Sequence, residues 1–335
     1  MEADGRTTEE LRQLLRTNNF FPEPELWIEF ARAHSLRAVS SERRMECPSC
    51  GSAARAALGQ YIYYSSLIRL QCCAHCDLIY SDVLLSPEVI SKHFESAYKD
   101  ESYFVRRRQA IFSEIAERVA TLLPKGGSVL DIGGAKGHLA NEILRRRPDA
   151  RIVVNDISQT SCDFAEQELG FATVCGGITT LGSIGERFDV VLGIDVAYYE
   201  PNLREAWQAF AALTAPNGHL LLRFPNRLRW IRFVEWLNAW GRRLGSVRQP
   251  QSRVASFNPE HIYIFSRRYI DATLRQHGFS EVRHLPSHFL ASKGIRNAVR
   301  QVIYRLVSLL ASATNGKFLL SSSQLVIAKR HEDKT

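Results

Sequence analysis

The sequence lacks the long apolar segments that membrane and secreted proteins carry. Its first ten residues, MEADGRTTEE, are polar and acidic, so the apolar core of a secretory signal is missing there. The most apolar stretch near the C-terminus, residues 302–313, is short and contains Arg305, which argues against a membrane-spanning helix. Internal repeats and low-complexity tracts are also missing. These absences predict a cytoplasmic globular protein.

The composition is that of an ordinary soluble protein, with enough apolar residues for a large core. Of the 335 residues, 45% are hydrophobic and 23% are charged. This length suits a catalytic domain together with a smaller one. The chain has seven cysteines. In a reducing compartment these indicate metal binding or simple burial and argue against a disulfide framework.

A formal net charge of +8 raises the question of nucleic acid or an anionic membrane as a partner. The runs Arg106–Arg108 and Arg145–Arg147 fall on predicted helices, where we interpret them as solvent-facing. Residues 227–244 combine three tryptophans with five arginines. A basic, aromatic helix of this kind either caps an acceptor pocket or makes peripheral contact with an anionic membrane. We favour the cap.

From residue 128 onward, short apolar runs alternate with segments that have helical periodicity. The apolar runs cover residues 128–132, 151–155, 171–175, 188–194 and 219–224. A helix is expected before them over 103–123, and further elements after them at 281–285, 296–310 and 318–329. Such alternation is typical of an α/β domain with a mostly parallel sheet that is covered by helices on both faces.

A glycine-rich turn follows the first of these strands, in the sequence VLDIGGAKG at residues 129–137. Glycines permit a tight turn and let backbone N–H groups approach a ligand at a helix N-terminus. The spacing differs from the GxGxxG of dinucleotide-binding turns. Asp131 at the strand end would repel a pyrophosphate and suits a ligand that bears an ammonium group. Asp156, at the end of the next strand, can accept hydrogen bonds from ribose hydroxyls.

A purely structural alternative exists for both acidic residues. Aspartates at strand-to-helix turns often cap the following helix, so Asp131 and Asp156 could be N-caps without a ligand. Their joint occurrence with the glycine turn favours the binding interpretation.

The ordered segments VLDIGGAKGHLA, VVNDIS, FDVVLGIDVAYYEPN and LTAPNGHLLLRFPN resemble the motifs of class I S-adenosylmethionine-dependent methyltransferases. The later NPEHIYIFSRRYIDATLRQHGFSEV resembles a segment of methyltransferases that act on small molecules. The resemblance covers about residues 86–330. It implies a Rossmann-like domain with a mostly parallel seven-stranded sheet and S-adenosyl-L-methionine as cofactor.

By this resemblance, the glycine turn and the neighbouring strand ends hold the cofactor, with the methionine end at Asp131 and the ribose at Asp156. The implied contact residues are Asp131, Gly133, Gly134, Gly137, Asp156, Ile157 and Asp195. Ala135 departs from the family, which usually has glycine in the middle of the turn. We expect alanine to be tolerated if its φ stays negative.

Four cysteines form two CxxC turns, Cys47 to Cys50 and Cys73 to Cys76, with 22 residues between them. Each turn offers two thiolates to one tetrahedral zinc ion, and a closed four-ligand site indicates a structural role. Cys72 could substitute for Cys73. The segment also resembles a zinc-binding piece that precedes methyltransferase domains acting on nucleotide-linked sugars, which implies a small zinc-ribbon-like module.

Methyl transfer requires alignment of donor and acceptor, and some acceptors must lose a proton to a base. The candidate bases lie beyond the carboxyl edge of the predicted sheet: Tyr199, Glu200, Glu260 and His261. The pair Glu260 and His261 resembles a polar pair near the acceptor in sugar carbon-methyltransferases. For His261, a structural hydrogen bond in a loop is the alternative.

The predicted organisation is a helical extension over residues 1–44, a zinc-binding module over 45–85 and a methyltransferase domain over 86–335, with a cap at about 225–262. We expect methyl transfer to a small-molecule acceptor such as a nucleotide-linked sugar or a glycan precursor. One alternative is an RNA methyltransferase that grips RNA through its zinc module and basic surface. The zinc segment argues against RNA binding, because its few basic residues are Arg55 and Arg69. The other alternative is a non-catalytic protein that binds the cofactor or a partner.

Overall fold

The computed structural model describes residues 43–63, 66–84, 101–226, 240, 262–291, 295–314 and 316–332. The chain divides into two compact units. One consists of Met1–Lys99 with Arg227–Tyr269, and the other of Asp100–Asn226 with Ile270–Thr335.

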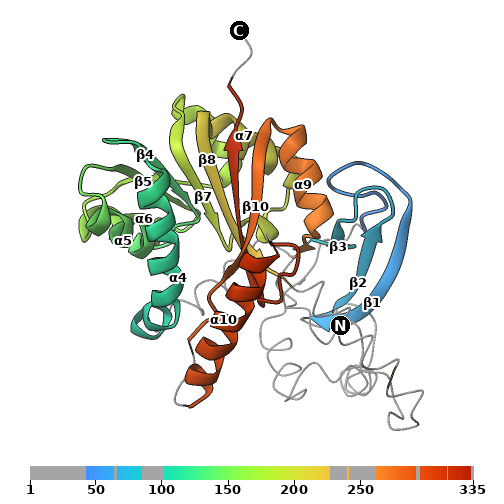
Figure 1. The fold of residues 1–335 in the computed structure, drawn as a ribbon. Helices are drawn as coiled ribbons and strands as arrows, with labels where there is room; N and C mark the ends of the chain where they lie inside the picture. Colours follow the sequence, from blue (N-terminus) through green and yellow to red (C-terminus); the bar gives the residue numbers. More distant parts are fainter. Residues whose placement is uncertain are drawn as a thin grey trace. The chain divides into compact units, whose positions relative to one another are not determined.

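The second unit is built around a seven-stranded sheet in the order β10-β11-β8-β7-β4-β5-β6 (Figure 1). Neighbours from β8 to β6 are all parallel, whereas β11 runs antiparallel to both β8 and β10. The prediction of a mostly parallel seven-stranded sheet is therefore confirmed. The strands are β4 (Ser128–Ile132), β5 (Arg151–Asp156), β6 (Ala172–Cys175), β7 (Phe188–Ile194), β8 (Thr214–Pro225), β10 (Phe279–Ser287) and β11 (Ser323–Arg330).

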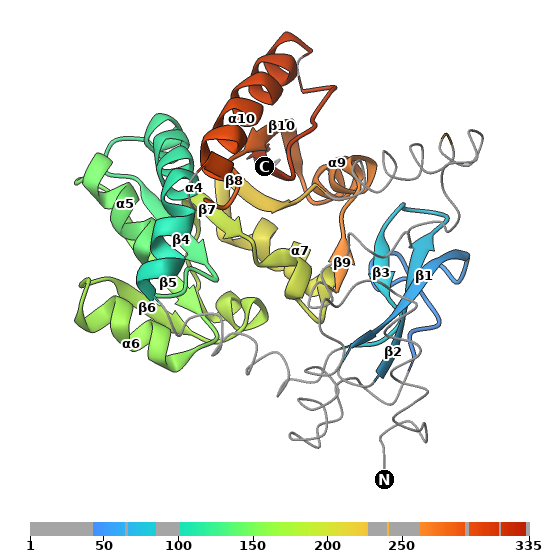
Figure 2. The same cartoon turned by 90° about the horizontal axis from the view of Figure 1, so that it is seen from below.

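Helices cover both faces of this sheet, as Figure 2 shows for α4 and α5 on one side and α7 on the other. Apolar residues of α4, α5 and α6 share one buried cluster with alternate residues of β4, β5, β7 and β11. On the opposite face, Gly193 leaves room for Phe210 of α7, whose ring lies 2.9 Å from where a Cβ would stand. The helices are α4 (Glu101–Leu122), α5 (His138–Arg146), α6 (Gln159–Gln167), α7 (Leu203–Leu213), α9 (Arg267–Gln276) and α10 (Ile295–Ala313), with 3-10 turns η1 (Ile178–Ile184) and η2 (Ala197–Tyr199).

The parallel register brings the carboxyl ends of three neighbouring strands to one edge of the sheet. Ile132 of β4 lies beside Asn155 of β5 on one side and Gly193 of β7 on the other. The residues at or just after these ends therefore form one continuous edge, which is where ligands bind in open α/β sheets.

The first unit contains a four-stranded antiparallel sheet in the order β1-β2-β3-β9. Its strands are β1 (Arg55–Tyr63), β2 (Ser66–Cys73), β3 (Ile79–Ser81) and β9 (Tyr263–Ile264). β9 comes from a distant part of the sequence and pairs with β3, and Ile262 accepts a hydrogen bond from the Ser81 N–H at 2.9 Å. This sheet was not predicted from the sequence.

Several predicted segments lie outside the described residues. They are the helical extension up to residue 42, the basic aromatic helix over 227–244 apart from Trp240, and the loop that contains Glu260 and His261. None of the helices that the structure does describe combines the length and the hydropathy that a bilayer span requires.

Candidate functional site

The glycine turn between β4 and α5 is held in a conformation with three left-handed residues. Gly133, Ala135 and Gly137 have φ of 67°, 49° and 77°. The condition under which we expected alanine to be tolerated, a negative φ, is therefore not met, and this residue adopts a backbone that usually favours glycine. The N-cap of α5 is Gly137, which has no side chain to cap the helix. The first N–H groups of α5 are thus left without a side-chain cap.

Space around the turn is restricted by Asp131. A Cβ on Gly134 would stand 2.8 Å from Asp131 Oδ2, and a Cβ on Gly133 would stand 2.8 Å from Val196 Cγ2. The Gly134 N–H donates to the carbonyl of Asn155 at 2.9 Å, which ties the turn to β5. Glycine is required at these two positions because the turn passes directly over the buried carboxyl group and Val196.

Asp131 is a buried carboxyl group with an unused oxygen. The residue is 1% exposed, and among the described residues Oδ2 has no hydrogen-bond partner. Burial, with a contribution from the nearby charge of Asp156, raises the pKa of Asp131 to about 7. An unpartnered carboxylate in the core is costly, and a cationic group would relieve that cost. The acid is not an N-cap of α5, so that alternative is wrong for Asp131.

Asp156 joins the glycine turn to the start of α6. Its Oδ2 accepts from the Ala135 N–H and its Oδ1 from the Ser158 N–H, both at 2.9 Å. Burial raises the pKa of Asp156, and these backbone hydrogen bonds oppose that rise. The N-cap of α6 is Ser158, whose hydroxyl accepts from Ser161 N, so the N-cap alternative is wrong for Asp156 as well. Each carboxylate oxygen retains further acceptor capacity.

Ile157 lies next to Asp156 and is an exposed aliphatic side chain, with 56% of its surface accessible. Among the residues that the structure describes, large aliphatic side chains are mostly buried, so an exposed one beside the polar strand ends offers an apolar contact to a ligand.

Asp195 follows β7 and is committed to two guanidinium groups. Its Oδ2 accepts from Arg108 Nη1 at 2.8 Å and from Nη1 of Arg223, which is 3% exposed. Its φ is 60°, and among the described residues Oδ1 has no hydrogen-bond partner. Neither arginine was predicted as a partner of Asp195. For Arg108, which is 22% exposed at the side chain, the solvent-facing interpretation is wrong.

Tyr199 and Glu200 come just after Asp195, at the end of η2. The ring of Tyr199 lies 4.5 Å from that of buried Tyr198, measured between centroids. Burial raises the pKa of Glu200 to about 7, which places its titration near neutral pH. Of the four candidate bases, these two are described; Glu260 and His261 are not.

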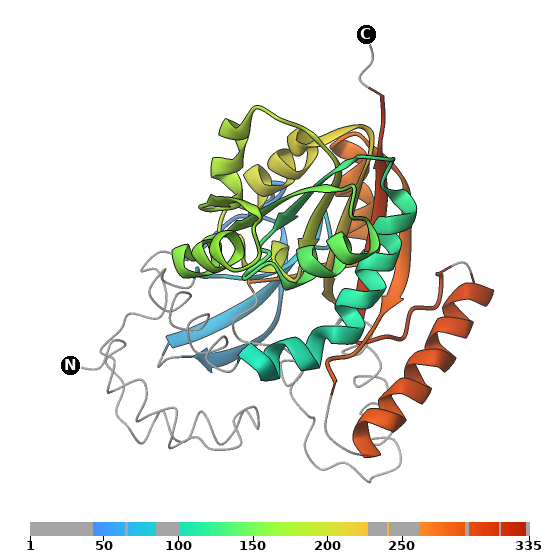
Figure 3. The ribbon, with the colours of Figure 1, turned by 90° about the vertical axis from the view of Figure 1, so that its left-hand side faces the viewer.

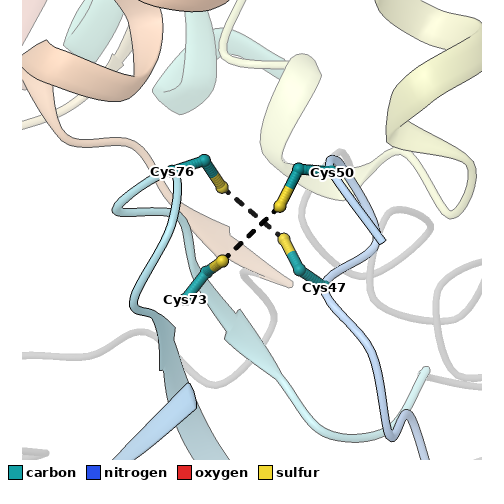
Figure 4. A group of neighbouring side chains, drawn as sticks. All are labelled: Cys47, Cys50, Cys73 and Cys76. Carbon is teal, nitrogen blue, oxygen red and sulfur yellow. Dashed lines mark hydrogen bonds between the residues drawn. The ribbon is translucent and has the colours of Figure 1, made fainter. Parts of the chain in front are cut away.

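The four cysteines of the CxxC turns converge in the first unit (Figure 4). Their sulfur atoms all lie within 4.8 Å of one another, and Cys47 Sγ to Cys76 Sγ and Cys50 Sγ to Cys73 Sγ are both 3.6 Å. The β1–β2 hairpin explains the convergence, because Arg55 pairs with Cys73 and so returns the second turn to the first. Cys72, the alternative ligand, is outside this cluster.

The two turns share one backbone pattern. In each, the first cysteine accepts a hydrogen bond from the residue four places later, Gly51 N to Cys47 O at 2.9 Å and Asp77 N to Cys73 O at 3.1 Å. Gly51 and Asp77 both have positive φ, 74° and 63°. The chain therefore builds the same thiol-presenting turn twice.

The thiols influence one another strongly. The hydrogen bond with the Cys76 thiol lowers the pKa of Cys47 to about 5, and the same contact raises the pKa of Cys76. All four are free thiols. A cluster of this kind concentrates negative charge when it ionises, which a divalent cation would balance.

Residues 104–284 match a family described as a methyltransferase domain. Among solved structures, an S-adenosylmethionine-dependent methyltransferase from Archaeoglobus fulgidus is 16% identical, with a TM-score of 0.42 over 68% of this chain and 99% of its own. The YcgJ protein from Bacillus subtilis is 18% identical, with a TM-score of 0.41 over 66% and 99%. The plantazolicin methyltransferase BamL, solved with a triazolic analog and S-adenosylhomocysteine, is 13% identical, with a TM-score of 0.45 over 73% and 92%. No curated protein sequence matches the chain significantly.

Proposed function

We propose that this chain, which belongs to the methyltransferase-domain family, transfers a methyl group from S-adenosylmethionine to a small-molecule acceptor. The match covers more than half of the chain, so the predicted enzyme class, a methyltransferase, is confirmed. The residues that act are proposed from the chemistry of the site, and the class of acceptor is proposed from the resemblance of the sequence motifs.

The observation that carries the cofactor assignment is the unpartnered oxygen of Asp131. The ammonium group of S-adenosylmethionine would pair with this carboxylate and offset the cost of its burial. The glycine turn would admit the methionine end, since Gly134 leaves no side chain over Asp131 and Gly133 leaves none against Val196. Asp156 would accept from the ribose hydroxyls through the acceptor capacity it retains.

We assign the apolar contact with the adenine ring of the cofactor to Ile157, which is exposed beside Asp156. For Asp195 we propose a positioning role. Because two arginines already hold its Oδ2, it would fix this edge of the sheet beside the cofactor. Its Oδ1 would still be available to a polar group of the methionine end.

S-adenosylmethionine, when bound, supplies a methyl group that is activated by the adjoining sulfonium. The protein must orient the acceptor in line with it and remove the acceptor proton where one is lost. Glu200 is our first candidate among the described residues, because its burial places its pKa near neutral pH. The reference pKa of a phenol is near ~10, so Tyr199 would need a larger shift than a carboxyl group to act as a base at neutral pH. The roles of Glu260 and His261 as bases stay predictions.

For the cysteine cluster we propose one structural zinc ion. Zinc–sulfur bonds of about 2.3 Å in a tetrahedron place the sulfurs about 3.8 Å apart. The two 3.6 Å sulfur pairs and the 4.8 Å limit for the others fit this arrangement. Four thiolates leave no open coordination position, so Cys47, Cys50, Cys73 and Cys76 would hold the ion without providing a catalytic site.

The acceptor is proposed to be a small molecule such as a nucleotide-linked sugar or a glycan precursor. Labelled S-adenosylmethionine, incubated with the protein and with separate metabolite and RNA fractions, tests this class directly. Label in the metabolite fraction supports the proposal. Label in RNA would favour the RNA methyltransferase, and binding of the cofactor without any transfer would favour the non-catalytic alternative. Cytoplasmic location and a cap or membrane contact at 227–244 also remain predictions.

A further inference from the structure

The helix α10 carries large aliphatic side chains on its solvent side. Eleven large hydrophobic residues are exposed among those that the structure describes, and eight of them fall between residues 299 and 320. Leu306 is 62% exposed and Leu309 is 69% exposed. Six of these residues lie on α10 at spacings of three and four, which places them on one side of the helix, here called the outer face: Val299, Val302, Ile303, Leu306, Leu309 and Leu310.

The opposite side of α10 is fixed to the methyltransferase domain. Val307 and Ala311 are buried there, and the Tyr304 hydroxyl donates to Glu114 Oε1 of α4 at 3.0 Å. Arg300 Nη1 donates to the carbonyl of Leu290 at 2.9 Å. Figure 3 shows α10 at the margin of the domain, beside α4. The outer face is thus held away from the core by contacts on the other side of the helix.

Among its charged residues, the segment that carries the outer face has only basic ones. Residues 295–320 contain Arg296, Arg300, Arg305 and Lys317 and no aspartate or glutamate. Arg305 is exposed within the helix, and Phe318 and Leu320 extend the apolar surface just after it. A patch of this size that combines aliphatic side chains with basic ones is unusual for a surface that faces only water.

We propose that the outer face of α10 docks on an anionic phospholipid surface. The helix would lie in the plane of the bilayer, with its aliphatic side chains among the acyl chains and Arg305 at the headgroup phosphates. A second copy of the chain is the less suitable occupant. Pairing two outer faces would bring together two segments that each contain four basic residues and no aspartate or glutamate. Charge complementarity therefore selects the anionic membrane.

Co-sedimentation with vesicles tests the proposal, using phosphatidylcholine mixed with phosphatidylglycerol and phosphatidylcholine alone. The native chain should sediment with the mixed vesicles, weakly with the neutral ones, and less as salt is raised. The double variant Leu306→Gln and Leu309→Gln removes apolar surface without changing charge, and should weaken binding by at least about tenfold. Ser312→Gln, at an exposed position on the same helix but away from the outer face, should bind like the native chain. Thermal unfolding of each variant checks that the fold is kept.

Three results would overturn the proposal. Equal binding to both kinds of vesicle would remove the anionic lipid as the partner. No vesicle binding, with a native dimer that the double variant dissociates, would assign the outer face to a second copy. No vesicle binding by a native monomer would mean that the face has no membrane partner.

Discussion

At the scale of single residues, cofactor binding depends on the carboxyl group of Asp131. With a pKa of about 7, it is largely protonated in the free protein below neutral pH. Pairing with an ammonium group favours the ionised form, so binding of S-adenosylhomocysteine should release a proton. Affinity should therefore fall about tenfold between about pH 8 and about pH 6, as linkage predicts for this pKa. Calorimetry across this range measures it.

The matched variant is Asp131→Asn, which cannot ionise. Its binding should be weaker and nearly independent of pH over the same range. If the native protein binds equally well at both ends of the range, Asp131 does not pair with the ammonium group.

Gly134 provides a test of the space above Asp131. In Gly134→Ala the new methyl group would stand 2.8 Å from Asp131 Oδ2, so the turn must shift and the affinity for S-adenosylhomocysteine should fall at least about tenfold. Gly182→Ala is the control, because a Cβ there meets nothing within 4 Å. Equal losses of affinity in the two variants would show that the effect is not local to Asp131.

The proposed role of Glu200 as the base predicts how the reaction rate depends on pH. As a base it must be ionised, so kcat/KM for the acceptor, measured with saturating S-adenosylmethionine so that Asp131 stays ionised, should rise with pH through about 7 and level off above it. Glu200→Gln should lower turnover by ~10²–10⁴-fold and abolish that rise, while cofactor affinity stays nearly unchanged. Rate measurements with the identified acceptor check this. If Glu200→Gln keeps full turnover and His261→Ala loses turnover, His261 and not Glu200 is the base.

Several residue-level contacts could not be predicted because they join distant parts of the chain. Helical periodicity places Arg108 on a helix but does not reveal that Asp195 lies opposite it. Arg147 likewise binds the carbonyls of Ala120, Leu123 and Pro124 instead of facing solvent. By contrast, Asp131 and Asp156 could be singled out, since a strand that ends in an acid before a turn is visible in the sequence.

At the scale of elements, the buried strands were the most predictable. β4 and β7 begin and end at the predicted residues, because both are mostly apolar runs that are bounded by turns. The β1–β2 hairpin was missed, since small and polar residues interrupt its pattern and a bulge lies between Ala57 and Gly59. β9 is two residues long and is defined by its partner β3, which no local pattern indicates.

The zinc module allows a prediction at this scale. Elemental analysis of the native protein should find about one zinc per chain. Cys47→Ser with Cys50→Ser should lose the metal and unfold the module, because the proposed ion would join the two turns. Cofactor binding should persist, since Asp131 and Asp156 belong to the other unit.

Cys72→Ser is the control for this experiment. Cys72 neighbours the cluster in sequence but does not belong to it, so the variant should keep its zinc. A native protein that folds fully without metal would contradict the assignment, and loss of zinc in Cys72→Ser would show that the ligand set is wrong.

At the scale of the whole molecule, the fold class followed from the order of strands and helices, and the family match agrees with it. Two properties of the molecule could not be predicted from the sequence. The identity of the acceptor depends on side chains that no motif specifies, and the exposed outer face of α10 looks in sequence like an ordinary amphipathic helix. Periodicity shows that a helix has an apolar side, but only packing shows which side is buried.

Calorimetric titration of the native protein with S-adenosylhomocysteine decides whether the proposed cofactor site exists. We expect one site per chain with a Kd on the order of micromolar. Asp156→Ala should bind clearly more weakly, because it loses both the ribose acceptor and the two backbone bonds to Ala135 and Ser158. If the folded native protein gives no heat of binding and no rise in Tm with saturating ligand, the proposed cofactor site is wrong.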